Sequence, residues 1–412
     1  MLSRRTFVQA ATTLPMLPVA LQAQRSPLEQ VRLGFIGLGG QGTSNLRVLM
    51  KHAVALCDVD SERLGKARDA VLNSAKNRKV ESYSDYRKML ESKELDAVVI
   101  STPDHWHALP TIDACNAGKH VYCEKPLTLT VAEGRAMVKA ARANKAIVQC
   151  GSQQRSNDTF RFACELVRNG LIGKVHTVKV GIPGVNFKGP PVPDSDPPAV
   201  LDYEFWLGPA PKRPYNLKRV HYNFRFFWDY SGGQLTNWGA HHLDIAQWGL
   251  GMDDTGPIAI EGTASYHPQK WYEVPQSCTV QYTYANGVKM TLTMGGRTGT
   301  EFIGEKGSIF VTRGKIETTP KELAKHTFDD KATRLYESNS HHANWLQCIK
   351  SGKLPICDVE IGHRSATVCH LGNIALRTGK KLKWDPVKET LDDPQAAKML
   401  SYEYRKPWKL PS

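Results

Sequence analysis

The stretch Val31-Arg32-Leu33-Gly34-Phe35-Ile36-Gly37-Leu38-Gly39-Gly40-Gln41-Gly42 decides the fold of this 412-residue chain. Its first half is largely apolar and predicts a buried strand, and its second half is a Gly-x-Gly-x-x-Gly turn that opens a helix. In such turns the first glycine permits a tight bend, the second lets the backbone approach a pyrophosphate, and the third allows close packing of helix on strand. The turn therefore predicts a dinucleotide site whose contacts are Gly37, Leu38, Gly39, Gly40, Gln41 and Gly42.

An acidic residue follows the next predicted strand. The apolar run 53–57 ends at Asp58, about 20 residues after the first glycine, where a carboxylate hydrogen-bonds the adenosine ribose. That carboxylate would repel a 2′-phosphate, and Val59 supplies no cation to reverse the effect. We expect NAD rather than NADP as the cofactor.

Strand-like and helix-like segments alternate up to residue 151, and the pattern of apolar residues then changes. The alternation predicts a parallel, doubly wound sheet. Later segments alternate with period two around Ala285-Asn286-Gly287, a hairpin signal, and predict a large mixed or antiparallel sheet with helices. The fold class is thus α/β with a second α+β domain. The expected parts are a Rossmann domain at 31–150, a substrate-binding α+β domain at 151–385 and a tail at 386–412.

The first residues resemble an export signal. Ser3-Arg4-Arg5-Thr6-Phe7 precedes a weakly apolar run and a small-residue cleavage point after Ala23. This layout predicts a twin-arginine signal at 1–23 and a periplasmic or secreted protein. No run approaches the ~20 apolar residues that span a bilayer, so we expect no membrane span.

Charge and cysteine usage argue against a nucleic-acid-binding protein and against a disulfide-rich protein. The formal net charge is +14, but it is spread along the chain without a basic block, and we expect no nucleic-acid partner. Several of the 9 cysteines lie in apolar runs typical of buried thiols, which argues against a disulfide framework.

Polar segments follow two strands at the sheet edge where ligands bind in such folds. Ser101-Thr102-Pro103-Asp104-His105-Trp106-His107 follows the strand 97–100, and Glu124-Lys125-Pro126 follows the strand 120–123. A lysine at this edge can perform acid–base chemistry if burial or a nearby positive charge lowers its pKa. Lys125 is therefore a candidate catalytic residue.

Four motifs together resemble the Gfo/Idh/MocA oxidoreductases, the family of glucose–fructose oxidoreductase and inositol dehydrogenase. They are the segments 37–42, 102–107, 123–126 and Gly232-Gly233-Gln234-Leu235-Thr236-Asn237-Trp238-Gly239-Ala240-His241-His242-Leu243-Asp244. The resemblance implies a nicotinamide cofactor on the first sheet, a polyol or sugar between the nicotinamide and the second sheet, and a homo-oligomer built through the second sheet.

The same resemblance assigns roles to individual residues. Lys125 would be the main acid/base residue and His241 the second proton-transfer or substrate-hydroxyl contact. Other cofactor contacts would come from the two post-strand segments, at Ser101, Thr102, Pro103, His107, Glu124 and Lys125 itself. Asn237 stands where many dehydrogenase members carry aspartate, and an amide cannot stabilise an imidazolium as a carboxylate does.

Several residues are candidates to contact substrate. They are Gln153, Arg155, Asn237, His241 and His242, although Gln153 and Arg155 could equally be surface residues and His242 a packed one. The segment Tyr222–Trp228 could be a sugar-stacking wall or part of the core. The histidines form no complete ligand set, so we expect no metal.

These features predict an exported enzyme that removes hydride from a secondary alcohol of a sugar or glycoside. Free NAD is scarce outside the cytoplasm, so the cofactor would be tightly bound and recycled in place. Two alternatives are a redox-neutral NAD-dependent glycosidase, which oxidises, eliminates, adds water and reduces, and a non-catalytic sugar-binding protein that retains the fold.

Overall fold

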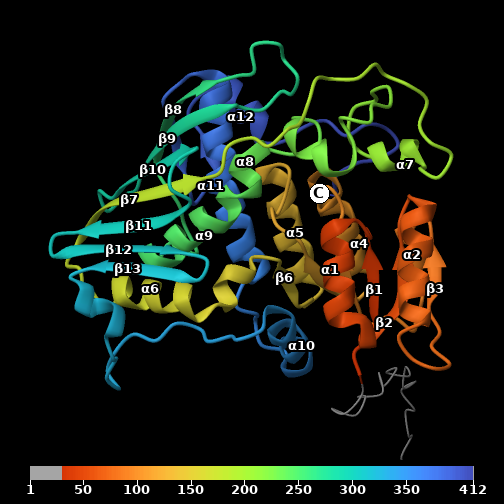
Figure 1. Ribbon diagram of the computed structural model, residues 1–412, viewed down its shortest axis with the longest axis horizontal. Coiled ribbons are helices and arrows are strands. Elements are labelled where there is room, and N and C mark those ends of the chain that lie inside the picture. Colours follow the sequence, from red (N-terminus) through yellow and green to blue (C-terminus); the bar gives the residue numbers. More distant parts are fainter. Residues whose placement is uncertain (1–29, 412) are drawn as a thin grey trace, which may run out of the picture. The chain divides into compact units, whose positions relative to one another are not determined.

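In the computed structural model, which describes residues 30–411, the chain from Val31 first builds a six-stranded parallel sheet in the order β3-β2-β1-β4-β5-β6 (Figure 1). The predicted signal at 1–23 lies outside the described residues. The strands are β1 (Leu33–Ile36), β2 (Ala53–Cys57), β3 (Glu81–Tyr83), β4 (Ala97–Ile100), β5 (His120–Cys123) and β6 (Val148–Cys150). The crossover helices are α1 (Gly40–Leu49), α2 (Ser61–Leu72), α3 (Tyr86–Leu90), α4 (Ala108–Asn116) and α5 (Val131–Ala143).

β1 and β4 are neighbours at the centre of this sheet, and the chain adds strands outward in opposite directions on either side of them. In open α/β sheets, ligands bind outside the carboxyl ends of the strands at such a switch point. β1 and β4 are buried along their whole length, as expected for central parallel strands. The predicted doubly wound sheet is confirmed.

The glycines of the turn after β1 are required by close contacts. Gly37 has a φ of +84°, and a Cβ there would lie 2.8 Å from the backbone of Ser101. A Cβ on Gly42 would lie 1.9 Å from the carbonyl oxygen of Gly37. Any side chain at either position would therefore force the turn away from its neighbours.

The second half builds a nine-stranded mixed sheet, which confirms the predicted α+β architecture. Its order is β13-β12-β11-β7-β10-β9-β8-β14-β15, with β7 and β10 parallel and the other pairs antiparallel. The strands are β7 (Val175–Ile182), β8 (Ala259–Ser265), β9 (Ser277–Thr283), β10 (Lys289–Met294), β11 (Gly299–Gly304), β12 (Gly307–Thr312), β13 (Lys315–Thr319), β14 (Leu382–Asp385) and β15 (Thr390–Leu391). The predicted hairpin joins β9 and β10, with Thr283 paired to Lys289.

Helices cover one face of this sheet and connect it to the first (Figure 1). Val178, Leu243 and Ile374 belong to one buried core between the sheet and its helices. The helices are α6 (Asp158–Arg168), α7 (Tyr203–Leu207), α8 (Gly233–Asn237), α9 (Gly239–Leu250), α10 (His341–Ser351), α11 (Val359–Thr378) and α12 (Pro394–Ala397). The 3-10 helices are η1 (Met50–His52), η2 (Asp104–Trp106), η3 (Gln153–Ser156), η4 (His221–Phe226), η5 (Lys321–Lys325) and η6 (Lys398–Leu400).

The two sheets are joined by ion pairs and by the end of the chain. Arg135 of α5 forms ion pairs with Glu360 of α11 and with Glu389. Near the end of the chain, the ring of Trp408 lies 4.9 Å from that of Trp106, beside the first sheet. The segment after 386 thus packs against the Rossmann half.

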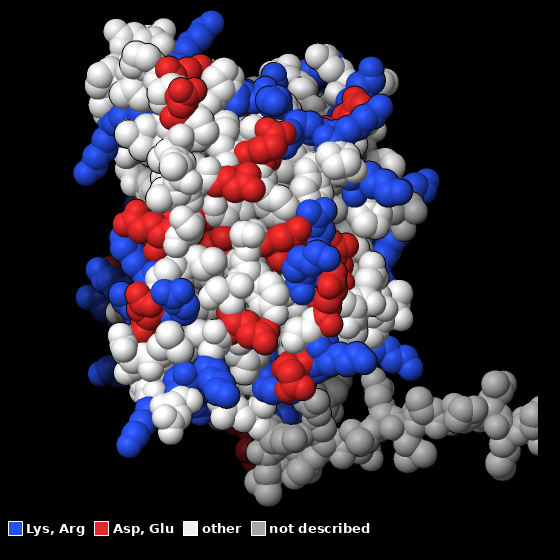
Figure 2. Space-filling model, turned by 90° about the vertical axis from the view of Figure 1, so that its right-hand side faces the viewer, with Lys and Arg blue, Asp and Glu red and all other residues white. Residues whose placement is uncertain are grey.

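Surface and cysteine features complete the description. All nine cysteines are free and buried. No helix of residues 30–411 is long and apolar enough to cross a membrane. On the face drawn in Figure 2, basic and acidic side chains are interspersed.

Candidate active site

A cavity of about 640 Å³ lies at the carboxyl ends of β1, β2, β4 and β5. Its other walls come from η4, from the segment that joins α8 to α9, and from the turn between β12 and β13. Most of the predicted site residues line it: Gly37, Gly39, Gly40, Gln41, Asp58, Ser101, Thr102, Pro103, His107, Glu124, Lys125, Gln153, Asn237 and His241. The cavity therefore brings the glycine turn and the candidate catalytic residues together.

Asp58, directly after β2, is held by hydrogen bonds from the backbone. Its two carboxylate oxygens accept hydrogen bonds from the amides of Leu38, at 2.6 Å, and Asp60, at 2.9 Å. Burial raises the pKa of Asp58. Leu38 is buried behind the turn, so its contact to a cofactor would be made through the backbone.

A cation that was not predicted from the sequence lies near Asp58. Arg63 of α2 lines the cavity, and a Cβ on Gly39 would lie 2.8 Å from its Nη1. Arg63 is 3.3 Å from the carboxylate of Asp60. Arg63 lies in the first turn of α2, directly after the helix cap, and this position is a signal from which its place in the cavity could have been predicted.

The residues at this end fit a dinucleotide. The glycine turn leaves a space that a Cβ would fill, and the N-terminus of α1 points its free amides at the same side of the sheet. A carboxylate at the end of β2 suits two ribose hydroxyls as acceptor. NAD would therefore be held by the glycine turn, Asp58 and the two segments after β4 and β5.

Glu124 connects the glycine helix to the catalytic segment. Its Oε1 accepts hydrogen bonds from the side-chain amides of Gln41, at 3.2 Å, and Asn45, at 3.0 Å. Asn45 also donates to the hydroxyl of Ser101. Burial raises the pKa of Glu124, and Asn45 partly offsets that effect. Asn45, which the sequence analysis did not name, is one turn after Gln41 on α1.

His107 joins the two post-strand segments. One ring nitrogen lies 2.8 Å from the carbonyl oxygen of Pro126, and the other lies 3.0 Å from that of Thr102. The ring therefore bridges the segment after β4 and the segment after β5, and so positions Lys125.

Lys125 points into the cavity toward α8. Its Nζ donates to the side-chain oxygen of Asn237 at 3.0 Å and to the Asn237 carbonyl at 3.1 Å. Burial lowers the pKa of Lys125, and the nearby guanidinium of Arg225 lowers it further. Both effects increase the fraction of neutral amine, which is the form that can accept a proton.

His241 lies beside this lysine near the start of α9. Burial lowers its pKa well below the ordinary value for histidine, and the charges of Lys125 and Arg313 add to the effect. Its Nδ1 has no hydrogen-bond partner among the described residues. A neutral imidazole has one donor and one acceptor nitrogen, and His241 lines the cavity, so its ring is a candidate to hydrogen-bond a substrate hydroxyl.

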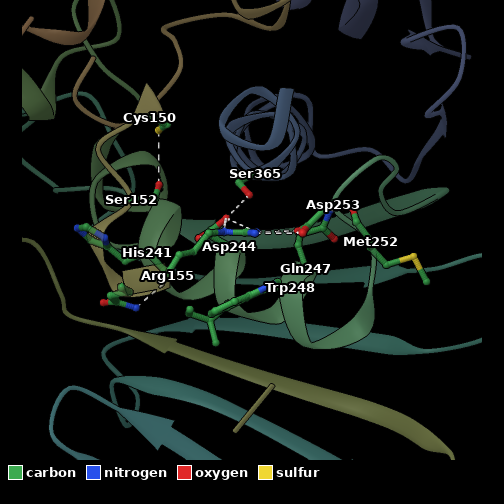
Figure 3. Close-up of polar contacts among 12 residues, drawn as sticks. Cys150, Ser152, Arg155, His241, Asp244, Gln247, Trp248, Met252, Asp253 and Ser365 are labelled. Atoms are coloured by element: carbon green, nitrogen blue, oxygen red, sulfur yellow. Dashed lines mark hydrogen bonds and ion pairs between the residues drawn. The ribbon is translucent and has the colours of Figure 1, made fainter. Parts of the chain in front are cut away.

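Two predicted substrate residues lie outside the cavity. Arg155 is 1% exposed, and its guanidinium forms ion pairs with Asp244 at 2.8 Å and Asp253 at 2.7 Å (Figure 3). The same Asp244 accepts a hydrogen bond from Ser365. Arg155 therefore fixes η3 to α9 and cannot reach a substrate, because its donors are already used.

His242 is the second such correction. It is 0% exposed, and its ring stacks on that of Trp238 at 6.2 Å. Residues 241 and 242 are neighbours on α9, so their side chains point in different directions. Only His241 faces the cavity, and His242 is a packed residue.

Some side chains of the segment 222–228 line the cavity, and others are buried in the core. Tyr222 and Phe224 line the cavity, whereas Phe226 and Phe227 are buried in an aromatic cluster beneath it. Asp104 is a further cavity residue, held by a hydrogen bond of 2.5 Å from the hydroxyl of Ser231. Burial raises the pKa of Asp104.

The region described contains no group of three or more His, Cys, Asp or Glu side chains placed to hold a metal ion. Further residues that were not named individually from the sequence also line the cavity. They include Trp238, Arg225 and Arg313.

Comparison with known proteins bears on both halves of the chain. A family model described as "Oxidoreductase family, NAD-binding Rossmann fold" matches residues 31–152, and one described as "Oxidoreductase family, C-terminal alpha/beta domain" matches residues 159–410. The match confirms the NAD-binding Rossmann half expected from the glycine turn.

Several relatives are inositol dehydrogenases. The chain is 27% identical to the scyllo-inositol 2-dehydrogenase (NAD(+)) of Bacillus subtilis, over 79% of this chain and 88% of that protein. It is 31% identical to the inositol 2-dehydrogenase of Salmonella typhimurium, but over 35% of this chain and 43% of that enzyme. The chain thus matches less than half the length of the Salmonella enzyme.

A solved structure shares the fold of both halves. The WlbA dehydrogenase from Bordetella pertussis, crystallised with NADH and UDP-GlcNAcA, superimposes with a TM-score of 0.66 at 19% identity. The superposition covers 87% of this chain and 99% of that one.

Proposed function

Because the chain belongs to the Gfo/Idh/MocA oxidoreductase family, we propose that it oxidises a secondary alcohol of a sugar, polyol or glycoside with NAD. The observation that carries this proposal is the position of Lys125. A buried amine with a lowered pKa follows β5 in the same cavity as the glycine turn. The inositol dehydrogenases among the relatives support a cyclic polyhydroxylated substrate.

We assign each residue of the site a role in this oxidation. The neutral amine of Lys125 accepts the proton of the substrate hydroxyl, while Asn237 holds Nζ in place. His241, neutral because it is buried, hydrogen-bonds a neighbouring hydroxyl. When bound, NAD supplies the hydride acceptor. Residues of η4 and of the α8–α9 segment line the cavity beside Lys125.

The proposal extends to where the protein works and how it assembles. The twin-arginine pattern at residues 3–7 supports export to the periplasm or beyond. An exported enzyme would keep NAD tightly bound and regenerate it in place. The helices cover one face of the nine-stranded sheet, and its other face supports a homo-oligomer built through that sheet.

The test is to denature the purified protein and identify the nicotinamide nucleotide that it releases. The proposal expects NAD or NADH, near one per chain, and reduction of the bound cofactor by at least one sugar of a panel. Protein that carries no nucleotide and takes up neither coenzyme would contradict it.

The same panel in deuterated water separates net oxidation from redox-neutral glycoside cleavage. Release of sugar that carries solvent deuterium, without accumulation of NADH, would identify a glycosidase. Binding of sugars with no hydride transfer at all would identify a non-catalytic binding protein.

A further inference from the structure

Two arginines that line the cavity form no ion pair with any of residues 30–411. Arg225 of η4 and Arg313, in the turn between β12 and β13, both line it. Within residues 30–411, neither guanidinium lies within ion-pairing distance of a carboxylate. Arg155 and Arg213, by contrast, each contact two carboxylates. The two cavity arginines are therefore available to an anion from outside the chain.

Arg313 is held in place through its Nε and its contact with an aromatic ring. Its guanidinium lies 4.8 Å from the ring centroid of Trp238, and its Nε donates to the side-chain oxygen of Gln154 at 3.1 Å. Gln154 in turn donates to the carbonyl of His241. Burial lowers the pKa of Arg313, and no carboxylate offsets that effect. The two Nη groups, which no described residue engages, form the fork that a carboxylate fits.

Arg225 is oriented in a similar way from the other segment. Its guanidinium lies 4.6 Å from the ring of Tyr222 and 4.7 Å from that of Phe224. One Nη donates to the carbonyl of Tyr222 at 2.9 Å. Arg225 lines the same cavity as Lys125.

The carboxylates of the cavity are already engaged elsewhere. Asp104 accepts from Ser231, and Glu124 accepts from Gln41 and Asn45. Asp58 lies at the adenosine end, where Leu38 donates to it. Asp104 still interacts electrostatically with Lys125 and Arg225. Among the described residues, no carboxylate offsets the effect of burial on the pKa of Arg313. Arg313 is therefore the cavity cation best placed to bind an anion from outside the chain.

We propose that the substrate is an acidic sugar whose carboxylate is bound by Arg313, with Arg225 as a second cation. This inference rests on the proposed function, because it names the substrate class of the same cavity. A phosphorylated sugar presents a similar anion, so the experiment includes both kinds. The planar fork of Arg313 and the single plane of a carboxylate favour the sugar acid.

The experiment uses the holoenzyme with its bound NAD and matched sugars. The probes are glucose and glucuronate, galactose and galacturonate, and glucose 6-phosphate. Calorimetry measures binding, and reduction of the bound cofactor measures kcat/KM. We expect at least one sugar acid to bind about tenfold or more tightly than its neutral partner. The preference should weaken at high salt.

Variants test the assignment. Arg313→Gln should lower affinity and kcat/KM for the sugar acid about tenfold to hundredfold, so that the preference for the acid over its neutral partner falls about tenfold or more. Arg297→Gln, an exposed arginine in the same half of the chain, is the matched control and should change neither. Arg225→Gln should also weaken binding of the acid; if it instead speeds loss of NAD, Arg225 binds the cofactor and its part in the proposal is overturned.

Three results would overturn the proposal. They are equal binding of acid and neutral sugars, an unchanged preference in Arg313→Gln, or a preference for glucose 6-phosphate alone. In each case, reduction of the bound NAD by a neutral or phosphorylated sugar would leave the proposed function intact. Tight binding of sugar acids with no reduction by any sugar would instead support this inference and contradict the oxidoreductase.

Discussion

The Nζ of Lys125 donates a hydrogen bond of 3.0 Å to the side-chain oxygen of Asn237. The partner is neutral, so it orients the amine without stabilising its positive charge as a carboxylate would. Burial and the nearby Arg225 therefore lower the pKa of Lys125 with little opposition from this neighbour.

Replacing Asn237 by aspartate should raise the pKa of Lys125. A carboxylate beside the ammonium raises the pKa of Lys125, so less of the amine is neutral at a given pH. In Asn237→Asp, the rise of kcat/KM with pH should move to higher pH by about one unit or more. Asn286→Asp, in an exposed turn, is the control and should keep the wild-type profile. A shift to lower pH would contradict the role given to Lys125.

Asp58 should determine both affinity for NAD and discrimination against NADP. Asp58→Ser removes the acceptor for the ribose hydroxyls, and should weaken NAD about tenfold or more. The preference for NAD over NADP should shrink, because Arg63 lies beside Gly39. Dissociation constants for both coenzymes check this, with the exposed Asp254→Ser as the control. Unchanged affinities would show that Asp58 has only a structural role.

His241 should act as a neutral group over the whole physiological range. Burial and the charges of Lys125 and Arg313 hold its pKa well below the usual value for histidine, which favours the neutral imidazole. His241→Gln should lower kcat by about tenfold to hundredfold. The pH profiles of wild type and variant should have the same shape near pH 6.5, because His241 does not titrate there. The exposed His176→Gln is the matched control. A wild-type limb near pH 6.5 that disappears in His241→Gln would refute the neutral assignment.

The ion pairs of Arg135 should stabilise the junction between the two sheets at neutral pH. Burial raises the pKa of Glu360, but hydrogen bonds from Arg135 and Arg364 outweigh it and lower that pKa to about 2, from an ordinary 4.5. The pKa of Glu389 is lowered as well, because His363 and Arg135 more than offset its burial. Stability from these groups is present above about pH 4.5 and is lost as the pH falls toward 2.

Arg135→Gln should therefore lower the free energy of unfolding by about 1 to 2 kcal/mol at pH 7, after allowance for solvent screening. The difference from wild type should shrink as the pH falls from 4.5 to 3. Denaturant unfolding at several pH values measures it, and Arg68→Gln, from an exposed ion pair, should change stability by less than about 0.5 kcal/mol. A difference that stays constant with pH would contradict the assignment to Glu360 and Glu389.

Local sequence signals predicted the first half well. The glycine turn, Asp58 and the two post-strand segments carry their information within a few residues, because parallel strands bring their carboxyl ends together by topology. The hairpin around Asn286 and Gly287 was equally local. β8 was missed because its strand is rich in small and polar residues and depends on pairing with β9.

The errors at the site have a common physical cause. Which side of a helix faces a cavity depends on packing between distant segments, and this separates His241 from His242. Arg155 was expected to bind substrate because it follows a strand, but Asp244 and Asp253 meet it from 89 and 98 residues away. Arg313 and Trp238 were not predicted as site residues for the same reason, since they meet only in the folded chain.

The central claim is that the amine of Lys125 exchanges the substrate proton next to a bound NAD. The most direct measurement is the rate at which a sugar reduces the bound cofactor in wild type and in Lys125→Met, with the cofactor content of both determined after denaturation. The account predicts equal content and a rate lowered about a hundredfold or more in the variant. Reduction at the wild-type rate, with equal cofactor content, would contradict it.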